Sequence, residues 1–537
     1  NYIGQFIYNA RTENDLTIKG GYDNSCNSQT LDAENTVLDA DENGTVLRII
    51  ASDLDSNIEI EGLSIVNGLI SETISPSGLI IRSEGDITLI NNKFSGNRQT
   101  KWADTNGNAV QILGYGKRFI TGNVFENNQS IRKYRQRGAA LFIATNTSFN
   151  NANYGGPVEL IELTNNTFFR NQTGYANVHI RSKSVTITNN EFTENTSIAD
   201  GSALIFSGLD SRDVNSICLV DSNVFVENSS STSTNSGSVA NFKYVKGCHI
   251  NNNIFRKNRS DRDSPVLSVS GNSSSDLNTI SNNVFEGNVI YDSYPNARVG
   301  TLGGKGMIVK NNIFKDNDLF ISDSSQSRTG TGGSAGIYCS RSCFIINNLI
   351  TGNTSEANGS GINIRNGTND STYILGNTIV NNHSDLKGGA IYLSTGESQD
   401  VLINNNLLYQ NSANEGNDIY FENDDNCQQL GTGILLKIFS SGVNTAMVAE
   451  EYTAATQIAE SLMAEASVME PLDIGETSGN EVEKYYWLVN IEKMENPVIE
   501  DNVGFMSVQV VVEWDSGDKN KRYIELNSIK PGLQNDN

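Results

Sequence analysis

Cysteines are the residues of this sequence with the clearest capacity for chemistry, because four of the six are spaced for pairing. Cys218 and Cys248 lie 30 residues apart, and Cys339 and Cys343 enclose the segment S-R-S. Either pair could form a disulfide, which would indicate an oxidising, extracytoplasmic location. Free buried thiols and a zinc site are the alternatives, although the three histidines are too scattered to favour zinc. No partner is predicted for the two remaining cysteines, Cys26 and Cys427.

An acidic turn, D-A-D-E-N-G, is a candidate for binding Ca²⁺. Its first, third and fifth positions carry the oxygen ligands that open a calcium loop, namely Asp39, Asp41 and Asn43. The bidentate Glu expected at the twelfth position is replaced by Ile50, so a plain acidic turn is the alternative. No other cofactor is predicted.

A dense basic run, R-K-Y-R-Q-R, stands out in a chain whose net charge is −24. Clustered cations could bind an acidic polysaccharide, and a solvated loop that balances local negative charge is the alternative. The residues predicted to bind are Arg132, Lys133, Tyr134, Arg135 and Arg137.

Carboxylates are the groups that an enzyme acting on polysaccharide would need to bring together as acid, base or nucleophile. Asp and Glu are spread along the chain without a recurring cluster. Glu159 and Glu162 are three residues apart, and an exposed surface explains them equally well. No catalytic residue is therefore predicted.

The charge and the apolar content of the sequence limit the classes of partner that this protein can bind. The chain has 38 Lys and Arg against 62 Asp and Glu, which argues against nucleic acid and anionic membranes as main partners. The sequence contains no stretch of 18 apolar residues, the length needed to span a membrane. The first residues have no signal-peptide pattern and resemble the middle of a repeat, so we expect a segment to precede them.

A repeated motif, Asn-x-Phe-x-x-Asn, organises most of the chain. It occurs eleven times at a period near 30 residues, with Ile or Leu replacing Phe in the last three copies. A period this short indicates a stacked array rather than separate domains. The copies with Phe begin at Asn92 and Phe94, Asn123 and Phe125, Asn166 and Phe168, Asn190 and Phe192, Asn223 and Phe225, Asn253 and Phe255, Asn283 and Phe285, and Asn312 and Phe314.

Short alternating runs accompany each motif and predict the architecture. Val185–Ile187 precedes an Asn pair, and Gly361–Ile364 is an example of a second run elsewhere in the unit. Three short strands and three turns per period predict one coil of a parallel β-helix of about 12 coils. Because coils stack about 4.8 Å apart, equivalent Phe residues should form an interior column. The Asn residues suit sharp corners, where their amides can bond to neighbouring coils.

The first 70 or so residues resemble the start of a known family of proteins. D-L-T-I-K-G-G-Y-D-N-S-C-N-S-Q-T-L-D-A-E-N-T-V-L-D-A (Asp15–Ala40), followed by I-E-G-L-S-I-V-N-G, resembles the start of large bacterial secreted right-handed parallel β-helix repeat proteins. The resemblance covers about residues 1–425 and implies a secreted or cell-surface protein. It does not imply one activity, because that family includes polysaccharide lyases, adhesins and proteins of unknown role.

The composition changes after residue 425. A boundary is expected at 426–433, followed by an α+β domain over 434–537. A helix is predicted from Ile434 to Met469, ending before Pro471, and strands are predicted at Tyr485–Ile491, Met506–Trp514 and Arg522–Leu526. The expected arrangement is a long helix on a small antiparallel sheet.

This C-terminal region resembles the minor pseudopilins of type II secretion and related type IV pilins. The similar segments are A-E-E-Y-T-A-A-T-Q-I-A-E-S-L-M-A-E-A, P-L-D-I-G-E-T-S-G, Y-Y-W-L-V-N-I-E and V-Q-V-V-V-E-W-D. The resemblance implies docking to pilin-like subunits through 434–469, or self-assembly. Unlike the family, this helix lacks a leader and most of the apolar part, so the region is either a repurposed fusion or joined unnaturally.

Together these observations predict a non-enzymatic, extracellular structural or adhesion protein, associated with a pilus or filament. A carbohydrate-active enzyme resembling polysaccharide lyases, or a polysaccharide-binding module, is the alternative.

Overall fold

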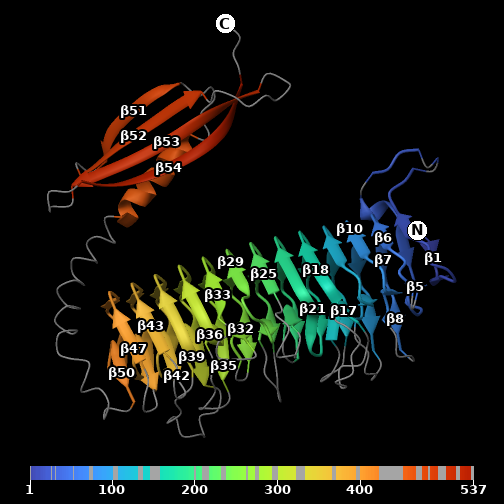
Figure 1. The fold of residues 1–537 in the computed structure, drawn as a ribbon, viewed down its shortest axis with the longest axis horizontal. Helices are drawn as coiled ribbons and strands as arrows, with labels where there is room; N and C mark the ends of the chain where they lie inside the picture. Colours follow the sequence, from blue (N-terminus) through green and yellow to red (C-terminus); the bar gives the residue numbers. More distant parts are fainter. Residues whose placement is uncertain are drawn as a thin grey trace. The chain divides into compact units, whose positions relative to one another are not determined.

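The computed structural model describes residues 2–23, 25, 27–30, 32–51, 54–71, 76–100, 107–130, 137–145, 158–198, 201–208, 217–230, 238–261, 264–271, 277–292, 300–321, 333–365, 371–394, 400–422, 452–466, 474–481, 484–493, 503–515 and 521–533. The chain divides into two compact units, Asn1–Gly431 and Thr432–Asn537. The first unit is a stack of coils that follow one another in sequence order (Figure 1).

In the part of the chain that the structure describes, three parallel sheets form the walls of the stack, and every strand in them pairs with the equivalent strands one coil away. The predicted parallel β-helix is therefore confirmed. Sheet 1 holds 14 strands: β1 (Tyr2–Ile3), β4 (Val37–Asp39), β7 (Ser64–Val66), β11 (Lys93–Ser95), β15 (Val124–Glu126), β19 (Thr167–Phe169), β22 (Glu191–Thr193), β26 (Val224–Val226), β30 (Ile254–Arg256), β34 (Val284–Glu286), β37 (Ile313–Lys315), β40 (Leu349–Thr351), β44 (Thr378–Val380) and β48 (Leu407–Tyr409).

Sheet 2 holds 24 strands and receives two segments from most coils. The first segments are β2 (Phe6–Asn9), β5 (Leu47–Ala51), β9 (Leu79–Ser83), β13 (Val110–Leu113), β17 (Arg137–Ala144), β24 (Leu204–Ser207), β28 (Ala240–Lys243), β32 (Leu267–Ser270), β42 (Ile362–Arg365), β46 (Ile391–Ser394) and β50 (Ile419–Phe421). The second segments are β3 (Leu16–Lys19), β6 (Ile58–Glu61), β10 (Ile87–Ile90), β14 (Arg118–Thr121), β18 (Val158–Thr164), β25 (Ile217–Asp221), β29 (His249–Asn251), β33 (Asn278–Ser281), β43 (Ser371–Leu375) and β47 (Asp400–Asn404). Three long strands supply both segments without a break: β21 (Ala176–Thr188), β36 (Leu302–Lys310) and β39 (Ile337–Ile346).

Sheet 3 holds 12 short strands: β8 (Leu69–Ile70), β12 (Arg98–Gln99), β16 (Gln129–Ser130), β20 (Gln172–Thr173), β23 (Thr196–Ser197), β27 (Ser229–Ser230), β31 (Arg259–Asp261), β35 (Val289–Asp292), β38 (Asp318–Ile321), β41 (Thr354–Ser355), β45 (His383–Lys387) and β49 (Ser412–Glu415). A 3₁₀ turn, η1 (Ala33–Asn35), lies near the N-terminal end. Most coils thus contain four strand segments in three sheets, whereas three strands were predicted. The two predicted runs, Val185–Ile187 and Gly361–Ile364, belong to the two segments of sheet 2. The prediction was short by one because strands of sheet 3 such as β12 and β16 have only two residues and show no alternation.

The Phe column fills the interior of the stack as predicted. Phe192 and Phe225, in consecutive coils, have ring centroids 4.7 Å apart and planes 2° from parallel. Each neighbouring pair in the column is stacked, with centroid distances between 4.5 and 4.9 Å. All eight rings are fully buried, so the column is a continuous apolar core. Its members are Phe94, Phe125, Phe168, Phe192, Phe225, Phe255, Phe285 and Phe314.

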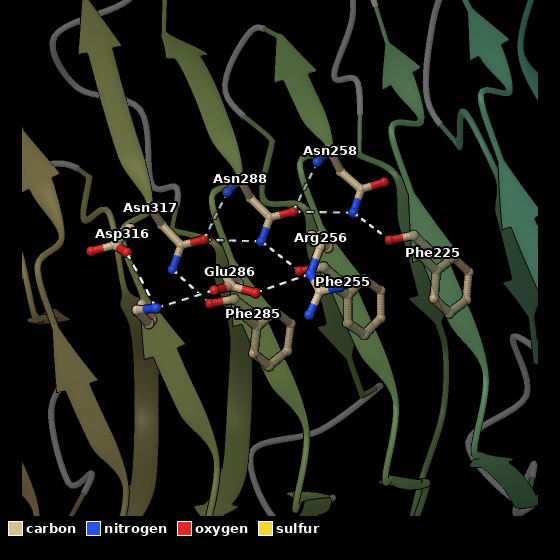
Figure 2. A network of polar contacts seen from close by, with 10 residues as sticks. Phe225, Phe255, Arg256, Asn258, Phe285, Glu286, Asn288, Asp316 and Asn317 are labelled. Carbon is tan, nitrogen blue, oxygen red and sulfur yellow. Dashed lines mark hydrogen bonds and ion pairs between the residues drawn. The ribbon is translucent and has the colours of Figure 1, made fainter.

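Two asparagine ladders flank this column, one at each end of sheet 1. The side-chain oxygen of Asn288 accepts hydrogen bonds from the backbone N–H and the side-chain amide of Asn258, both at 3.0 Å (Figure 2). The Asn258 amide also donates to the carbonyl of Phe225 at 2.8 Å. Equivalent bonds continue through the copies of the motif, which satisfies a buried polar group at every corner. The predicted corner residues are all buried: Asn92, Asn123, Asn166, Asn190, Asn223, Asn253, Asn283 and Asn312.

Both predicted disulfides are present. Cys218–Cys248 joins adjacent coils, with Cα atoms 4.6 Å apart. Cys339–Cys343 lies within β39, where it encloses Arg341, a residue with a φ of 84°. Cys26 and Cys427 lie outside the described residues.

The second unit is an α+β domain. A helix over 452–466 packs on a four-stranded antiparallel sheet made of β51 (Gly475–Glu481), β52 (Tyr485–Lys493), β53 (Val503–Asp515) and β54 (Lys521–Leu533). Its core includes Ala455 and Ala459 from the helix and Trp514 from the sheet. The predicted helix extended from 434 to 469, and its remaining parts lie outside the described residues. β51 was not predicted.

Candidate functional site

A groove on the outer surface of sheet 2 is lined by described residues of four strands. Its volume is about 480 Å³, and it crosses four consecutive coils at β28, β32, β36 and β39. The lining residues are Ser238, Asn241, Lys243, Tyr244, Ser264, Pro265, Ser268, Val269, Ser270, Gly303, Gly304, Lys305, Tyr338 and Ser340.

The groove exists because one outward-facing column of side chains becomes small at two coils. Register places Asn241, Ser268, Gly303 and Tyr338 side by side in that order. Asn241 and Tyr338 are buried and form the two ends, while Ser268 and Gly303 leave the space between them. Gly303 packs close to its neighbour: a Cβ there would lie 2.8 Å from Pro265 Cγ. A larger residue at Gly303 would therefore have to move the wall of the groove.

A second column along the groove alternates cations with hydroxyls. Lys243, Ser270, Lys305 and Ser340 occupy equivalent positions in the four coils. All four line the groove, and Lys305 is exposed. None of the described lining residues is Asp or Glu, although the whole chain carries 62 of them. The described part of the groove is thus rich in lysine and hydroxyl groups on an acidic protein.

Hydroxyl, amide and ammonium groups give this groove a definite chemistry. Ser and Tyr hydroxyls can donate and accept hydrogen bonds, and Lys donates three. Such a lining suits a ligand with many hydroxyls and some negative charge. The described lining has none of the carboxylate, thiolate or imidazole groups that commonly hold metal ions.

Arg118 is the most deeply buried cation among the described residues. It takes the place that Ile87 and Ile161 hold in the neighbouring coils. Its guanidinium donates to the carbonyls of Gly85 at 2.7 Å and Ser83 at 3.2 Å. Burial lowers its pKa to about 10, while the nearby carboxylates Asp86 and Glu84 oppose this shift. These bonds hold a turn in place and leave Arg118 a structural residue.

The predicted polysaccharide-binding run is not part of the groove's described lining. Residues 131–136 lie outside the described part of the chain, so Arg132, Lys133, Tyr134 and Arg135 are not placed. Arg137 begins β17, and its side chain is not described.

The predicted calcium ligands lie near the N-terminal end. Both carboxylate oxygens of Asp39 accept hydrogen bonds from the Asn67 amide at 3.2 Å, and Oδ1 also accepts the backbone N–H of Asp41. Asp41 has a φ of 49°, which places it in a tight turn. Calcium binding remains a prediction. Across the described ranges, no group of three or more His, Cys, Asp and Glu residues is arranged to hold a metal ion.

Glu159 and Glu162 both belong to β18, which pairs with β14 and β21 in sheet 2. Neither residue is among the described lining of the groove. Glu162 stands between Phe119 and Thr186 in its column, so no acid lies beside it there. They are not brought together with the groove residues.

The groove residues were missed in the sequence because they fall outside the repeated motif. The available signal was the replacement of large residues by Ser268 and Gly303 at strand positions that are otherwise bulky. That signal needs the register between strands, which the sequence alone does not provide.

The comparisons with known proteins support this architecture. Residues 48–208 match the family model described as right handed beta helix region. Neither a curated protein nor a solved structure matches the chain. Within the described residues, no helix combines the length and apolar character needed to cross a membrane.

Proposed function

We propose that this protein is a non-enzymatic extracellular adhesion or structural protein that binds polysaccharide through the groove on sheet 2. The Ser, Asn, Tyr and Lys side chains of the described lining are the observation that carries the proposal. Polyhydroxylated ligands offer many hydrogen-bond donors and acceptors, which match these side chains.

The scaffold around the groove supports a binding role. Most of the lining residues stand on strands whose register is held by the Phe column and the Asn ladders. A site on rigid strands keeps its geometry when empty, so little ordering entropy is lost on binding. The two disulfides favour an extracellular location, because such bonds persist in oxidising compartments.

A lyase is the second candidate, and one observation favours it. Lys243, Tyr244, Lys305 and Tyr338 all line the groove, and lysine and tyrosine can exchange protons with a substrate. A lyase acting on uronate polymers would create unsaturated ends that absorb ultraviolet light. Growth of that absorbance with purified protein would replace the binding proposal with the enzymatic one.

Blocking the groove tests the binding proposal. Ser268→Trp should fill the space between Asn241 and Tyr338 and reduce polysaccharide binding on a glycan array at least tenfold. Thr279→Trp is the matched control, because Thr279 lies half-exposed on β33 and does not line the groove. Equal binding by both variants and the unaltered protein would refute the groove as the binding site.

The association of the C-terminal unit with a pilus or filament belongs to the same proposal. It rests on the resemblance of 433–532 to pseudopilins and on the helix-on-sheet arrangement of that unit. Electron microscopy of particles from the native source tests it. A sample that contains monomers and no filaments would count against assembly.

A further inference from the structure

One outward column of sheet 2 alternates a cation with a serine over eight consecutive coils. It runs through β21, β24, β28, β32, β36, β39, β42 and β46, well beyond the groove. In order, its residues are Arg181, Ser207, Lys243, Ser270, Lys305, Ser340, Arg365 and Ser394.

The register of the strands makes this a true column rather than a coincidence of sequence. Arg181 pairs with Ser207, which pairs with Lys243. The pairing continues through Ser270, Lys305 and the later members without a slip. The other side chains in these strands alternate between the core and the neighbouring outward column, so these eight occupy one line.

The spacing of the cations follows from the stacking. Adjacent parallel strands lie about 4.8 Å apart, so cations in alternate coils are roughly 10 Å apart. That separation is about one Debye length at 0.1 M salt, so their mutual repulsion is partly screened. Members of the column are half-exposed, apart from Lys305, which is exposed.

The alternation favours a linear ligand whose charges repeat at the same interval. One sugar in an extended chain advances by a distance similar to one coil. A negative group on every second sugar would therefore meet each cation in turn, and the intervening sugar would face a serine hydroxyl. A duplex nucleic acid strand carries a charge about every 3.4 Å, which is too dense for this column.

We propose that this column, which we name the cation–serine column, binds an acidic polysaccharide that carries one anionic group per disaccharide. The chain of sugars lies along the solenoid axis, and its central part occupies the groove at Lys243, Ser270, Lys305 and Ser340. This inference rests on the proposed polysaccharide-binding function and adds the charge pattern of the ligand.

A charge-conserving exchange tests the spacing. The double variant Lys305→Ser/Ser340→Lys keeps the net charge and the composition but moves one cation by one coil. It should bind hyaluronan, in which a carboxylate occurs on alternate sugars, at least tenfold more weakly than the unaltered protein. Its binding to polygalacturonate, which is charged on every sugar, should change less than twofold. Binding is measured by calorimetry on the full chain, and thermal unfolding checks that each variant is folded.

Single substitutions provide a second readout if the exchange perturbs folding. Lys305→Gln should weaken hyaluronan binding severalfold, whereas Lys310→Gln, an exposed lysine in the other half of β36, should not. Equal hyaluronan binding by the exchange variant and the unaltered protein would overturn the inference. Preference for a neutral glycan or for single-stranded DNA would overturn it also. A neutral-glycan preference leaves the proposed function standing, and failure to bind any glycan removes both.

Discussion

At each corner of sheet 1, two adjacent residues have separate tasks. The first has a left-handed backbone, with φ between 52° and 68°, and the second is the ladder asparagine. The left-handed residue is often Asn or Gly, but Glu194, Glu227 and Lys257 also occupy it. These longer side chains cost more in this conformation than glycine would. The ladder asparagine is present in all eleven motifs because its amide bonds to the coils on both sides.

Removing one ladder amide should therefore be costly. Asn258→Ala leaves the Phe225 carbonyl and the backbone N–H of Asn228 without their partner inside the core. Each buried unsatisfied group costs about 1–3 kcal/mol, so we expect a loss of about 3 kcal/mol in the free energy of unfolding. Denaturant titration measures this. Asn404→Ala, at an exposed position, should change stability by less than about 0.5 kcal/mol. A loss that small for Asn258→Ala would contradict the structural role of the ladder.

Asp318 is expected to give a pH-dependent effect. Burial raises the pKa of its carboxyl, the adjacent Asp316 adds to the shift, and a bond with Thr354 opposes it. The folded state then holds the proton at a higher pH than the unfolded state, so stability falls as pH rises through this range. Asp318→Asn should raise the melting temperature at neutral pH, and the difference should vanish near about pH 3. A larger gain at acidic pH would reverse the assigned sign.

At the scale of strands, the core could be predicted from the sequence even though the loops differ in length from coil to coil. The Phe column and the ladders sit within one short window, Asn-x-Phe-x-x-Asn, so their register is visible in the sequence. The cation–serine column is different because its members are separated by 25 to 36 residues. Turns of variable length intervene, and a slip of one residue would place another side chain outward.

The interior column offers a direct test of packing. Phe192 lies between Phe168 and Phe225, with centroids 4.8 and 4.7 Å away. Phe192→Ala should lower the free energy of unfolding by about 3–5 kcal/mol, because the cavity cannot collapse between fixed coils. Phe192→Leu, which keeps most of the volume, should cost about 1.5 kcal/mol or less. If chemical denaturation shows the same loss in the free energy of unfolding for both variants, the result would argue against a packed column.

β51 shows the limit of strand prediction from composition. Its sequence, G-E-T-S-G-N-E, has few residues that favour strands, and it is almost entirely exposed. It forms because its backbone pairs with the edge of β52 over seven residue pairs. Such a strand is specified by its neighbour rather than by its own side chains.

At the scale of the whole molecule, the repeat determined the architecture but not the ligand. The period near 30 residues, the Asn–Phe motif and the Cys218–Cys248 spacing were sufficient to predict a β-helix with a disulfide between coils. The groove arises from the absence of bulk at Ser268 and Gly303, and a small residue carries no periodic signal. Function on this scaffold therefore depends on which outward positions deviate from the pattern.

The disulfide between adjacent coils has a mechanical consequence. If the two ends of the solenoid are placed under tension, coils can detach one after another, each adding to the extended contour. Cys218–Cys248 keeps a 30-residue segment from extending, which would withhold roughly 100 Å of length. Optical-tweezer traces recorded with and without reductant should differ by about one such step. For an adhesive protein, this bond would reduce by one step the length that the solenoid releases under load.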